Sequence, residues 1–122
     1  MDFKTFKKKA LKIKDLYSHL NQVKGENKWG LTEYTRAFIG DVGDLNKMIM
    51  AKQGYREWAD RGHNLEAELI DCFWALFIIG NELNVDLERQ SELWFSNMEK
   101  AIEEKLTLEE KRTQSKQQGI ND

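Results

Sequence analysis

Two pairs of acidic residues stand out because each pair is spaced to share one face of a helix. Asp41 and Asp44 lie three residues apart in GDVGDL, and Glu68 and Asp71 have the same spacing in AELID. Residues at positions i and i+3 are neighbours on a helix surface. Each pair falls on or beside an apolar stripe, where an isolated carboxylate is costly unless it is paired, hydrogen-bonded or bound to a metal.

A metal site is the chemistry that these residue types favour. If the two helices pack antiparallel, the four carboxylates converge in a groove of low dielectric, where their charges repel. Ligands that are all oxygen favour Mg²⁺, with Mn²⁺ as a possible substitute, over zinc. Gly43 lies inside the first motif and costs a helix about 1 kcal/mol relative to alanine, which suggests close approach of another backbone or a ligand. For Asp71 alone, a capping or salt-bridged carboxylate is the other interpretation.

Other metal and catalytic sites lack their ligands in this chain. Neither His19 nor His63 follows a carboxylate by three residues in these motifs, as the Glu-x-x-His pairs of di-iron bundles require. Cys72 is the single cysteine, which excludes an internal disulfide and a zinc site built from closely spaced Cys and His residues. The sequence favours a core-packing role for Cys72 in a reducing compartment. No phosphate-binding P-loop is present.

Helical periodicity supplies the elements that would position the acidic pairs. The run from Leu69 to Ile79 is apolar except for Asp71, as in a helix buried on all sides. Lysines fill the outer positions of the first helix; a solvated face is the preferred interpretation, with a membrane or nucleic-acid surface as the alternative. The predicted helices cover Phe3–Leu20, the segment from N-cap Thr32 to about Gln53 with Gly54 after its end, the segment from N-cap Asn64 to about Asn81–Asn84, and the segment from about Asp86 onward.

Length and charge set the class of protein. The 122 residues predict one all-α domain over residues 1–108 and a polar, flexible tail over 109–122. The formal charge of −2 argues against a dedicated nucleic-acid binder. Neither a signal peptide nor a membrane-spanning run is found, so a cytoplasmic protein without membrane contact is expected. The apolar circumference of the third helix predicts a homodimer or homotetramer.

The two acidic motifs resemble those of a known family. GDVGDLNKMI resembles the Glu-x-x-Glu motif, and AELIDCFWALFIIGNELNVDLE the following Glu-x-x-Asp motif, of MazG-like all-α nucleoside triphosphate pyrophosphohydrolases. This group includes dCTP pyrophosphatases and dimeric dUTPases. The likeness extends from about Trp29 to Ile102. It implies a four-to-five-helix, oligomeric MazG-like bundle that uses Mg²⁺ to cleave a nucleoside triphosphate between the α- and β-phosphates, giving a monophosphate and pyrophosphate.

The resemblance also implies roles for particular residues. Asp41, Asp44, Glu68 and Asp71 would be both the metal ligands and the catalytic set. Two departures are present: both glutamates of the first motif are aspartates here, and the last helix lacks the family's cluster of Lys, Asn and Arg. Candidate substrate-binding residues are Lys52, Arg56 and Arg61 for the phosphates, and Trp29, which either stacks on the base or fills the core. The alternative is a non-catalytic nucleotide-binding or structural helical oligomer with the same fold.

Overall fold

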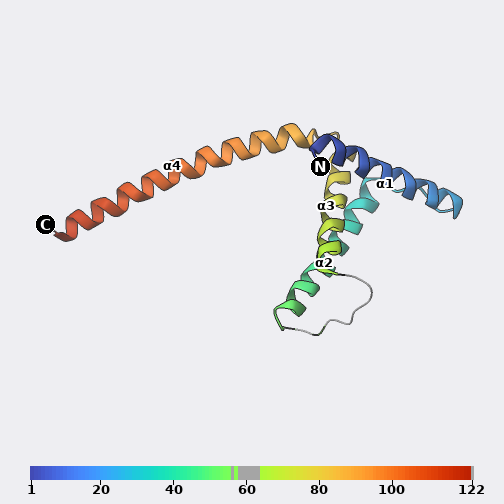
Figure 1. Ribbon diagram of the computed structural model, residues 1–122, viewed down its shortest axis with the longest axis horizontal. Helices are drawn as coiled ribbons and strands as arrows, with labels where there is room; N and C mark the ends of the chain where they lie inside the picture. The colour runs from blue at the N-terminus through green and yellow to red at the C-terminus, as the bar shows by residue number, and fades with distance from the viewer. Residues whose placement is uncertain (56, 58–63, 122) are drawn as a thin grey trace. The chain divides into compact units, whose positions relative to one another are not determined.

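In the part of the chain that it describes, the computed structural model consists of helices joined by turns and loops, with no strand there. That part comprises residues 1–55, 57 and 64–121; of Asn121, only the backbone is described. The helices are α1 (Phe3–Val23), α2 (Leu31–Lys52), α3 (Leu65–Glu82) and α4 (Leu87–Asn121), shown in Figure 1. The predicted all-α class is confirmed.

Side-chain caps explain where α1 and α3 begin. Asp2 accepts a hydrogen bond from the backbone N–H of Thr5 at 2.8 Å, and Asn64 accepts one from Ala67 at 2.7 Å. Each cap satisfies a helix-terminal N–H group that has no partner within the helix. The sequence prediction of Asn64 as an N-cap is confirmed.

The start of α2 differs from the prediction. Its N-cap is Gly30, so Thr32 lies inside the first turn. The Glu33 carboxylate accepts a hydrogen bond from the Gly30 N–H at 3.4 Å, and this contact supports the earlier start. At the other end, Gly54 follows the helix with a φ of 82°, a left-handed conformation that suits glycine, as predicted.

The cap at Asn64 gives a first prediction. Asn64→Ala should lower the free energy of unfolding by about 1 kcal/mol, because the Ala67 N–H loses its acceptor. Asn64→Gly should cost only a few tenths of that amount, since glycine is itself a favoured N-cap residue whereas alanine is not. Urea unfolding followed by circular dichroism measures both values. An unchanged free energy of unfolding in Asn64→Ala would show that the side-chain cap contributes nothing.

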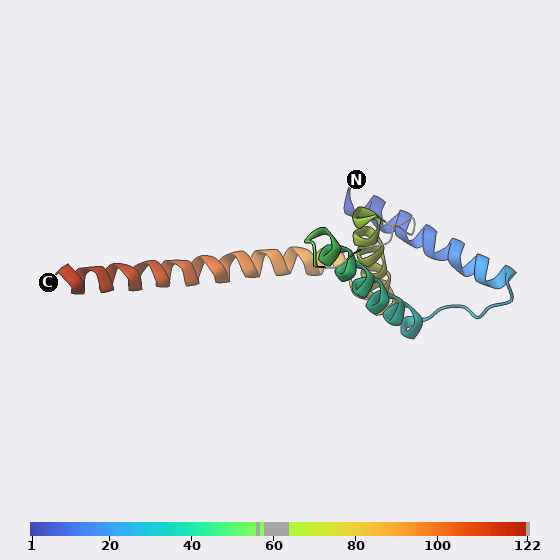
Figure 2. The same cartoon turned by 90° about the horizontal axis from the view of Figure 1, so that it is seen from below.

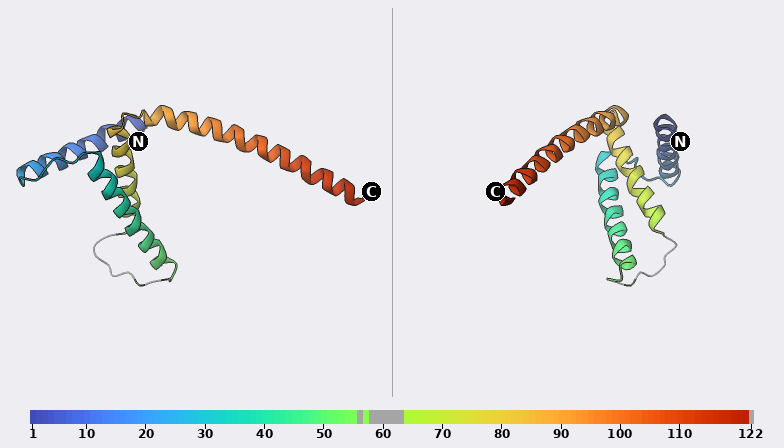
Figure 3. Two further views of the ribbon diagram at one scale, coloured as in Figure 1. Left: turned by 180° about the vertical axis from the view of Figure 1, so that it is seen from behind. Right: turned by 60° about the vertical axis from the view of Figure 1, so that its left-hand side comes forward.

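The first unit of the chain, residues 1–86, is built on an antiparallel pair of helices. Figures 1 and 3 show α2 and α3 side by side, with α1 against α3. The Phe6 ring of α1 meets the rings of Phe73 and Phe77 at centroid distances of 5.0 and 5.2 Å. Further along α1, the carbonyl of Ala10 accepts a hydrogen bond from the Trp74 indole N–H at 3.1 Å. These contacts fix α1 against α3.

An ion pair and an aromatic group reinforce the packing. Lys14 of α1 pairs with Glu82 at the end of α3, and Tyr34 of α2 lies edge-on to Trp74 at 6.3 Å. The core of the unit is concentrated on α3, where Ile78 is fully buried. The buried apolar residues are Ala10, Tyr34, Met48, Cys72, Ala75, Phe77 and Ile78.

The prediction that α3 is buried on all sides is wrong for this unit. The helix is covered in part by α2 and by α1, but Leu69 and Leu76 are each more than half exposed, as is Phe73 beside its contact with Phe6 of α1. Three helices from one chain leave part of this circumference open. None of the described helices combines the length and the apolar character needed to cross a membrane.

The second unit, residues 87–122, consists of α4. This helix continues to Asn121, beyond Leu108, where the sequence predicted frayed chain (Figure 2). Glu, Lys, Arg and Gln dominate this end of the chain and are good helix formers. Arg112 and Glu109 also form an ion pair at 3.6 Å one turn apart. The domain boundary at residue 108 and the flexibility of the tail remain predictions.

Candidate metal centre

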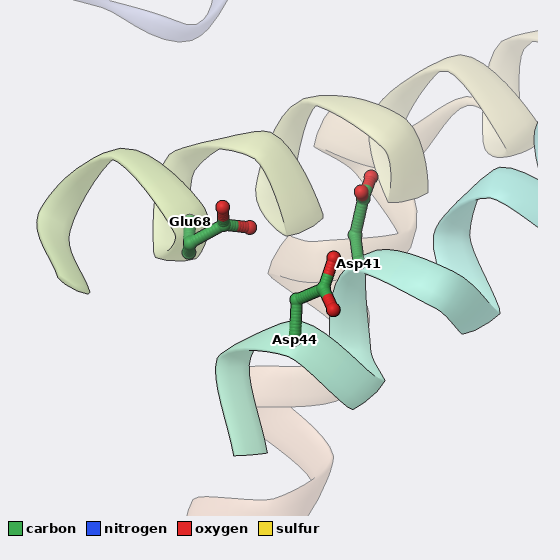
Figure 4. A group of neighbouring side chains, drawn as sticks. All are labelled: Asp41, Asp44 and Glu68. Atoms are coloured by element: carbon green, nitrogen blue, oxygen red, sulfur yellow. The ribbon is translucent and has the colours of Figure 1, made fainter. Parts of the chain in front are cut away.

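Three of the four predicted carboxylates lie together between α2 and α3. Asp41 and Asp44 lie one turn apart on α2, and Glu68 comes from α3. One carboxylate oxygen from each residue lies within 4.8 Å of the other two. Figure 4 shows the two aspartates extending from α2 toward the helix that carries Glu68. The antiparallel pairing assumed from the sequence is therefore the arrangement that brings the two motifs together.

Asp71, the fourth predicted ligand, lies one turn after Glu68 on α3 and is exposed. It is outside the three-residue group, yet its charge acts on Asp41. Asp71 therefore lies at the edge of this acidic group rather than in its centre.

Burial and repulsion combine at Asp41. Its carboxyl group is half-buried, and burial is the main cause that raises its pKa above the ordinary value of 3.8. The negative charges of Asp71 and Asp44 raise the pKa further. Among the described residues, the charges that act on Asp41 are all of its own sign. A cation at this position would relieve both the repulsion and the cost of burial.

Two buried neighbours of Asp41 belong to the same acidic surroundings. Glu68 has a relative exposure of only 4%, the one buried acidic residue among those described. Cys72 is also buried; burial raises the pKa of its thiol, and the surrounding carboxylates raise it further. The thiol is therefore kept protonated, which agrees with its interpretation as core packing rather than a nucleophile or metal ligand.

The donor set fits a hard divalent cation. All the candidate ligand atoms are carboxylate oxygens, drawn from two helices and partly shielded from water. Mg²⁺ and Mn²⁺ prefer such ligands, whereas zinc prefers nitrogen and sulfur.

For Gly43, the expected close approach of another backbone is wrong among the described residues, whereas close approach of a ligand stays a prediction. A Cβ atom built at this position would meet no heavy atom within 4 Å. Neither a neighbouring backbone nor a side chain of the described residues therefore requires glycine here.

Of the predicted substrate-binding residues, the two that the structure describes, Trp29 and Lys52, do not lie beside the acidic group. Trp29 packs edge-on against Tyr34 at 5.6 Å, just before α2 begins, and is 42% exposed. Asp41 lies ten residues beyond Leu31, about 15 Å along the helix axis. Lys52 is the exposed last residue of α2. Arg56 and Arg61 lie outside the described residues.

Lys14 has a partner that the sequence does not predict. A solvated face is expected for the lysines of the first helix, but Lys14 pairs with Glu82 of α3. The spacing is a usable signal, because Lys14 lies four residues after Ala10 and three before Tyr17, both of which contact Trp74 of α3.

The raised pKa of Asp41 predicts a dependence of stability on pH. Its carboxyl binds a proton more tightly in the folded state, so without metal the folded state loses stability as pH rises through the raised pKa. Asp41→Asn should therefore raise the Tm of metal-free protein by a few degrees at pH 7, and this gain should vanish below the ordinary pKa of 3.8. Thermal unfolding in EDTA at several pH values measures the effect. A lower Tm for Asp41→Asn at pH 7 would contradict it.

Comparison with known proteins finds one partial similarity in sequence. No family model matches the chain, and no solved structure matches it. An arginine–tRNA ligase from Alkaliphilus metalliredigens is 38% identical over 74 residues. The matched segment is 57% of this chain but only 12% of the ligase. The chain is thus similar to a small portion of that protein.

Proposed function

We propose that the protein is a Mg²⁺-dependent nucleoside triphosphate pyrophosphohydrolase of the MazG-like kind. The observation that carries the proposal is the meeting of Asp41, Asp44 and Glu68, which come from two separate acidic motifs, within 4.8 Å. The order of the motifs along the chain supports it further. The products would be a nucleoside monophosphate and pyrophosphate.

The carboxylates have two tasks in this proposal. Asp41, Asp44 and Glu68 would hold the cation, and the exposed Asp71 would complete its ligands from the edge of the group. Bound Mg²⁺, or Mn²⁺ in its place, would neutralise the phosphate charges and lower the pKa of an attacking water. A carboxylate beside this water would accept its proton.

Recognition of the substrate would fall to residues around this centre. Lys52, Arg56 and Arg61 are the proposed phosphate contacts, since each carries a positive charge near the end of α2 or in the segment after it. Trp29 is the proposed base-stacking residue. The contact of Trp29 with Tyr34 favours a packing role within one chain. For Trp29 to stack on the base, the substrate would have to extend well beyond the carboxylates.

The alternative is a non-catalytic helical protein that binds nucleotide or acts only through its structure. The observation that favours it is the pair of aspartates, Asp41 and Asp44, in place of the family's glutamates. Each side chain is shorter by one methylene, which changes how far an oxygen reaches from α2. This alternative predicts metal binding without turnover.

Location and assembly are part of the same proposal. We expect a cytoplasmic protein that acts on small nucleotides as a homodimer or homotetramer, without a nucleic-acid or membrane partner. The similarity to a portion of an arginine–tRNA ligase assigns none of that enzyme's activity to this chain.

The test is a screen of ordinary and modified nucleoside triphosphates with Mg²⁺. The readout separates pyrophosphate from orthophosphate, with EDTA-treated protein as the control. Pyrophosphate released only with the metal supports the proposal. Orthophosphate as the product would contradict it, and intact nucleotides throughout would favour the non-catalytic alternative.

A further inference from the structure

The second half of α1 carries an apolar seam that stays exposed among the described residues. Its members follow one another at spacings of three, four and three, and we call them the outer seam: Ile13, Leu16, Leu20 and Val23. At about 100° per residue they fall within a sector of roughly 80°. Their relative exposures lie between 43% and 71%. The outer seam is therefore an open apolar strip about three helical turns long.

The outer seam is separate from the side of α1 that packs on α3. Phe6, Ala10 and Tyr17 make contacts with α3. The mean direction of these three residues and the centre of the outer seam differ by roughly 80° around the helix. Figures 1 and 2 show the second half of α1 extending away from α3. The packing of α1 within the first unit therefore leaves the outer seam uncovered.

The spacing of the outer seam is that of a helix which packs against one other helix. Alternating steps of three and four residues are the a and d positions of a heptad, with Ile13 and Leu20 at a and Leu16 and Val23 at d. A sector of this width is narrower than the stripe that a helix presents to a protein core. A helix that lies on a membrane offers a broader apolar face that includes Trp or Phe. The outer seam is narrow and wholly aliphatic, which favours a single partner helix.

The residues beside the outer seam indicate which helix would fit. The e and g positions that flank it are Lys12, Tyr17, His19 and Lys24, and none of them is acidic. In paired helices these positions meet those of the partner, and opposite charges there set partner choice. Two copies of α1 would bring lysines toward lysines, which opposes like charges. Within the described residues, neither Lys12 nor Lys24 forms an ion pair.

We propose that the outer seam binds an amphipathic helix of another protein. This partner helix has aliphatic residues at a and d and carboxylates at the e and g positions that meet Lys12 and Lys24. The apolar contacts supply the affinity, and the ion pairs select the acidic partner. The proposal does not rest on the hydrolase activity, because the outer seam includes none of the carboxylates of the candidate metal centre.

The experiment compares two synthetic helical peptides as probes. Each has leucine at every a and d position; one has glutamate at every e and g position, and the other has lysine there. Fluorescence anisotropy of dilute, labelled peptide measures its binding to the full chain. The glutamate peptide should bind about 10-fold more tightly than the lysine peptide, or better, because only its charges complement Lys12 and Lys24.

A substitution in the outer seam tests the apolar contacts. Leu16→Ala should weaken binding of the glutamate peptide by about 10-fold or more, because it truncates a side chain in the middle of the seam. The matched control is Ile39→Ala, since Ile39 is 66% exposed on α2 and lies outside the outer seam. This control should bind the peptide as the wild type does.

Charge reversal is a second variant, and it leaves the apolar residues intact. Lys12 and Lys24 are exposed, so their joint replacement by glutamate should keep the fold and make the lysine peptide the tighter ligand. Equal binding of the two peptides by the wild type, or no binding of either, would overturn the proposal.

Three further outcomes would assign the outer seam to a different occupant and so contradict the proposal. A smaller oligomeric mass in Leu16→Ala, measured by light scattering, would assign it to a second copy of this chain. A larger loss of Tm in Leu16→Ala than in Ile39→Ala, without peptide, would assign it to another helix of the same chain. Binding to phosphatidylserine vesicles that Leu16→Ala abolishes would assign it to a membrane. Pyrophosphate release is measured separately, so failure of either proposal leaves the other standing.

Discussion

Asp41→Asn is expected to lower the rate of Mg²⁺-dependent nucleotide hydrolysis by about 100-fold or more, because it removes a charged ligand from the centre of the acidic group. Asp44→Asn should have an effect of similar size, since its carboxylate belongs to the same group. The rate of pyrophosphate release at saturating nucleotide measures both. Asp15→Asn is the matched control, because Asp15 is an exposed aspartate of α1 that belongs to no such group.

Thermal unfolding with and without Mg²⁺ measures metal binding separately from catalysis. Mg²⁺ should raise the Tm of the wild type by linkage, and Asp41→Asn or Asp71→Asn should abolish this gain. Replacing Asp41 and Asp44 together by glutamate should keep or raise activity if the shorter side chains limit it. Wild-type turnover that survives in Asp41→Asn would contradict the assignment of the site. Metal binding without turnover, in the wild type and in the double glutamate variant, would establish the non-catalytic alternative.

Ile78→Ala should cause the largest loss of stability among single substitutions in the first unit. Ile78 has no exposed surface, and truncation of a buried isoleucine costs about 2–5 kcal/mol through lost burial and the cavity that remains. Denaturant unfolding measures the loss. Ile70→Ala is the control, since Ile70 is 60% exposed on the same helix and should cost less than about 0.5 kcal/mol. Equal effects would mean that α3 does not form the core described above.

Local signals in the sequence were sufficient for the helices and for most of the acidic group. The i, i+3 spacing of the carboxylates depends only on helical geometry, so the convergence of Asp41, Asp44 and Glu68 could be predicted once antiparallel packing was assumed. Asn64 could be predicted as a cap because its side chain bonds within one turn. These features are decided by residues close together in the chain.

Features that depend on distant residues or on competing local contacts were predicted less well. Helix α2 has its N-cap at Gly30 rather than at Thr32, because the Glu33 carboxylate accepts a hydrogen bond from the Gly30 N–H. This contact competes with a cap at Thr32. The pairing of Lys14 with Glu82 depends on how α1 crosses α3. The open side of α3 likewise depends on how many helices one chain can supply. Neither of these two arrangements can be read from the periodicity of a single helix.

The site of bond cleavage tests the central claim most directly. Nucleoside triphosphate is hydrolysed with Mg²⁺ in ¹⁸O-labelled water, and the products are separated and analysed by mass spectrometry. Water attack at the α-phosphorus predicts that the label enters the nucleoside monophosphate and that pyrophosphate is unlabelled. Label in pyrophosphate or release of orthophosphate would contradict the account, as would equal turnover by the Asp41→Asn protein.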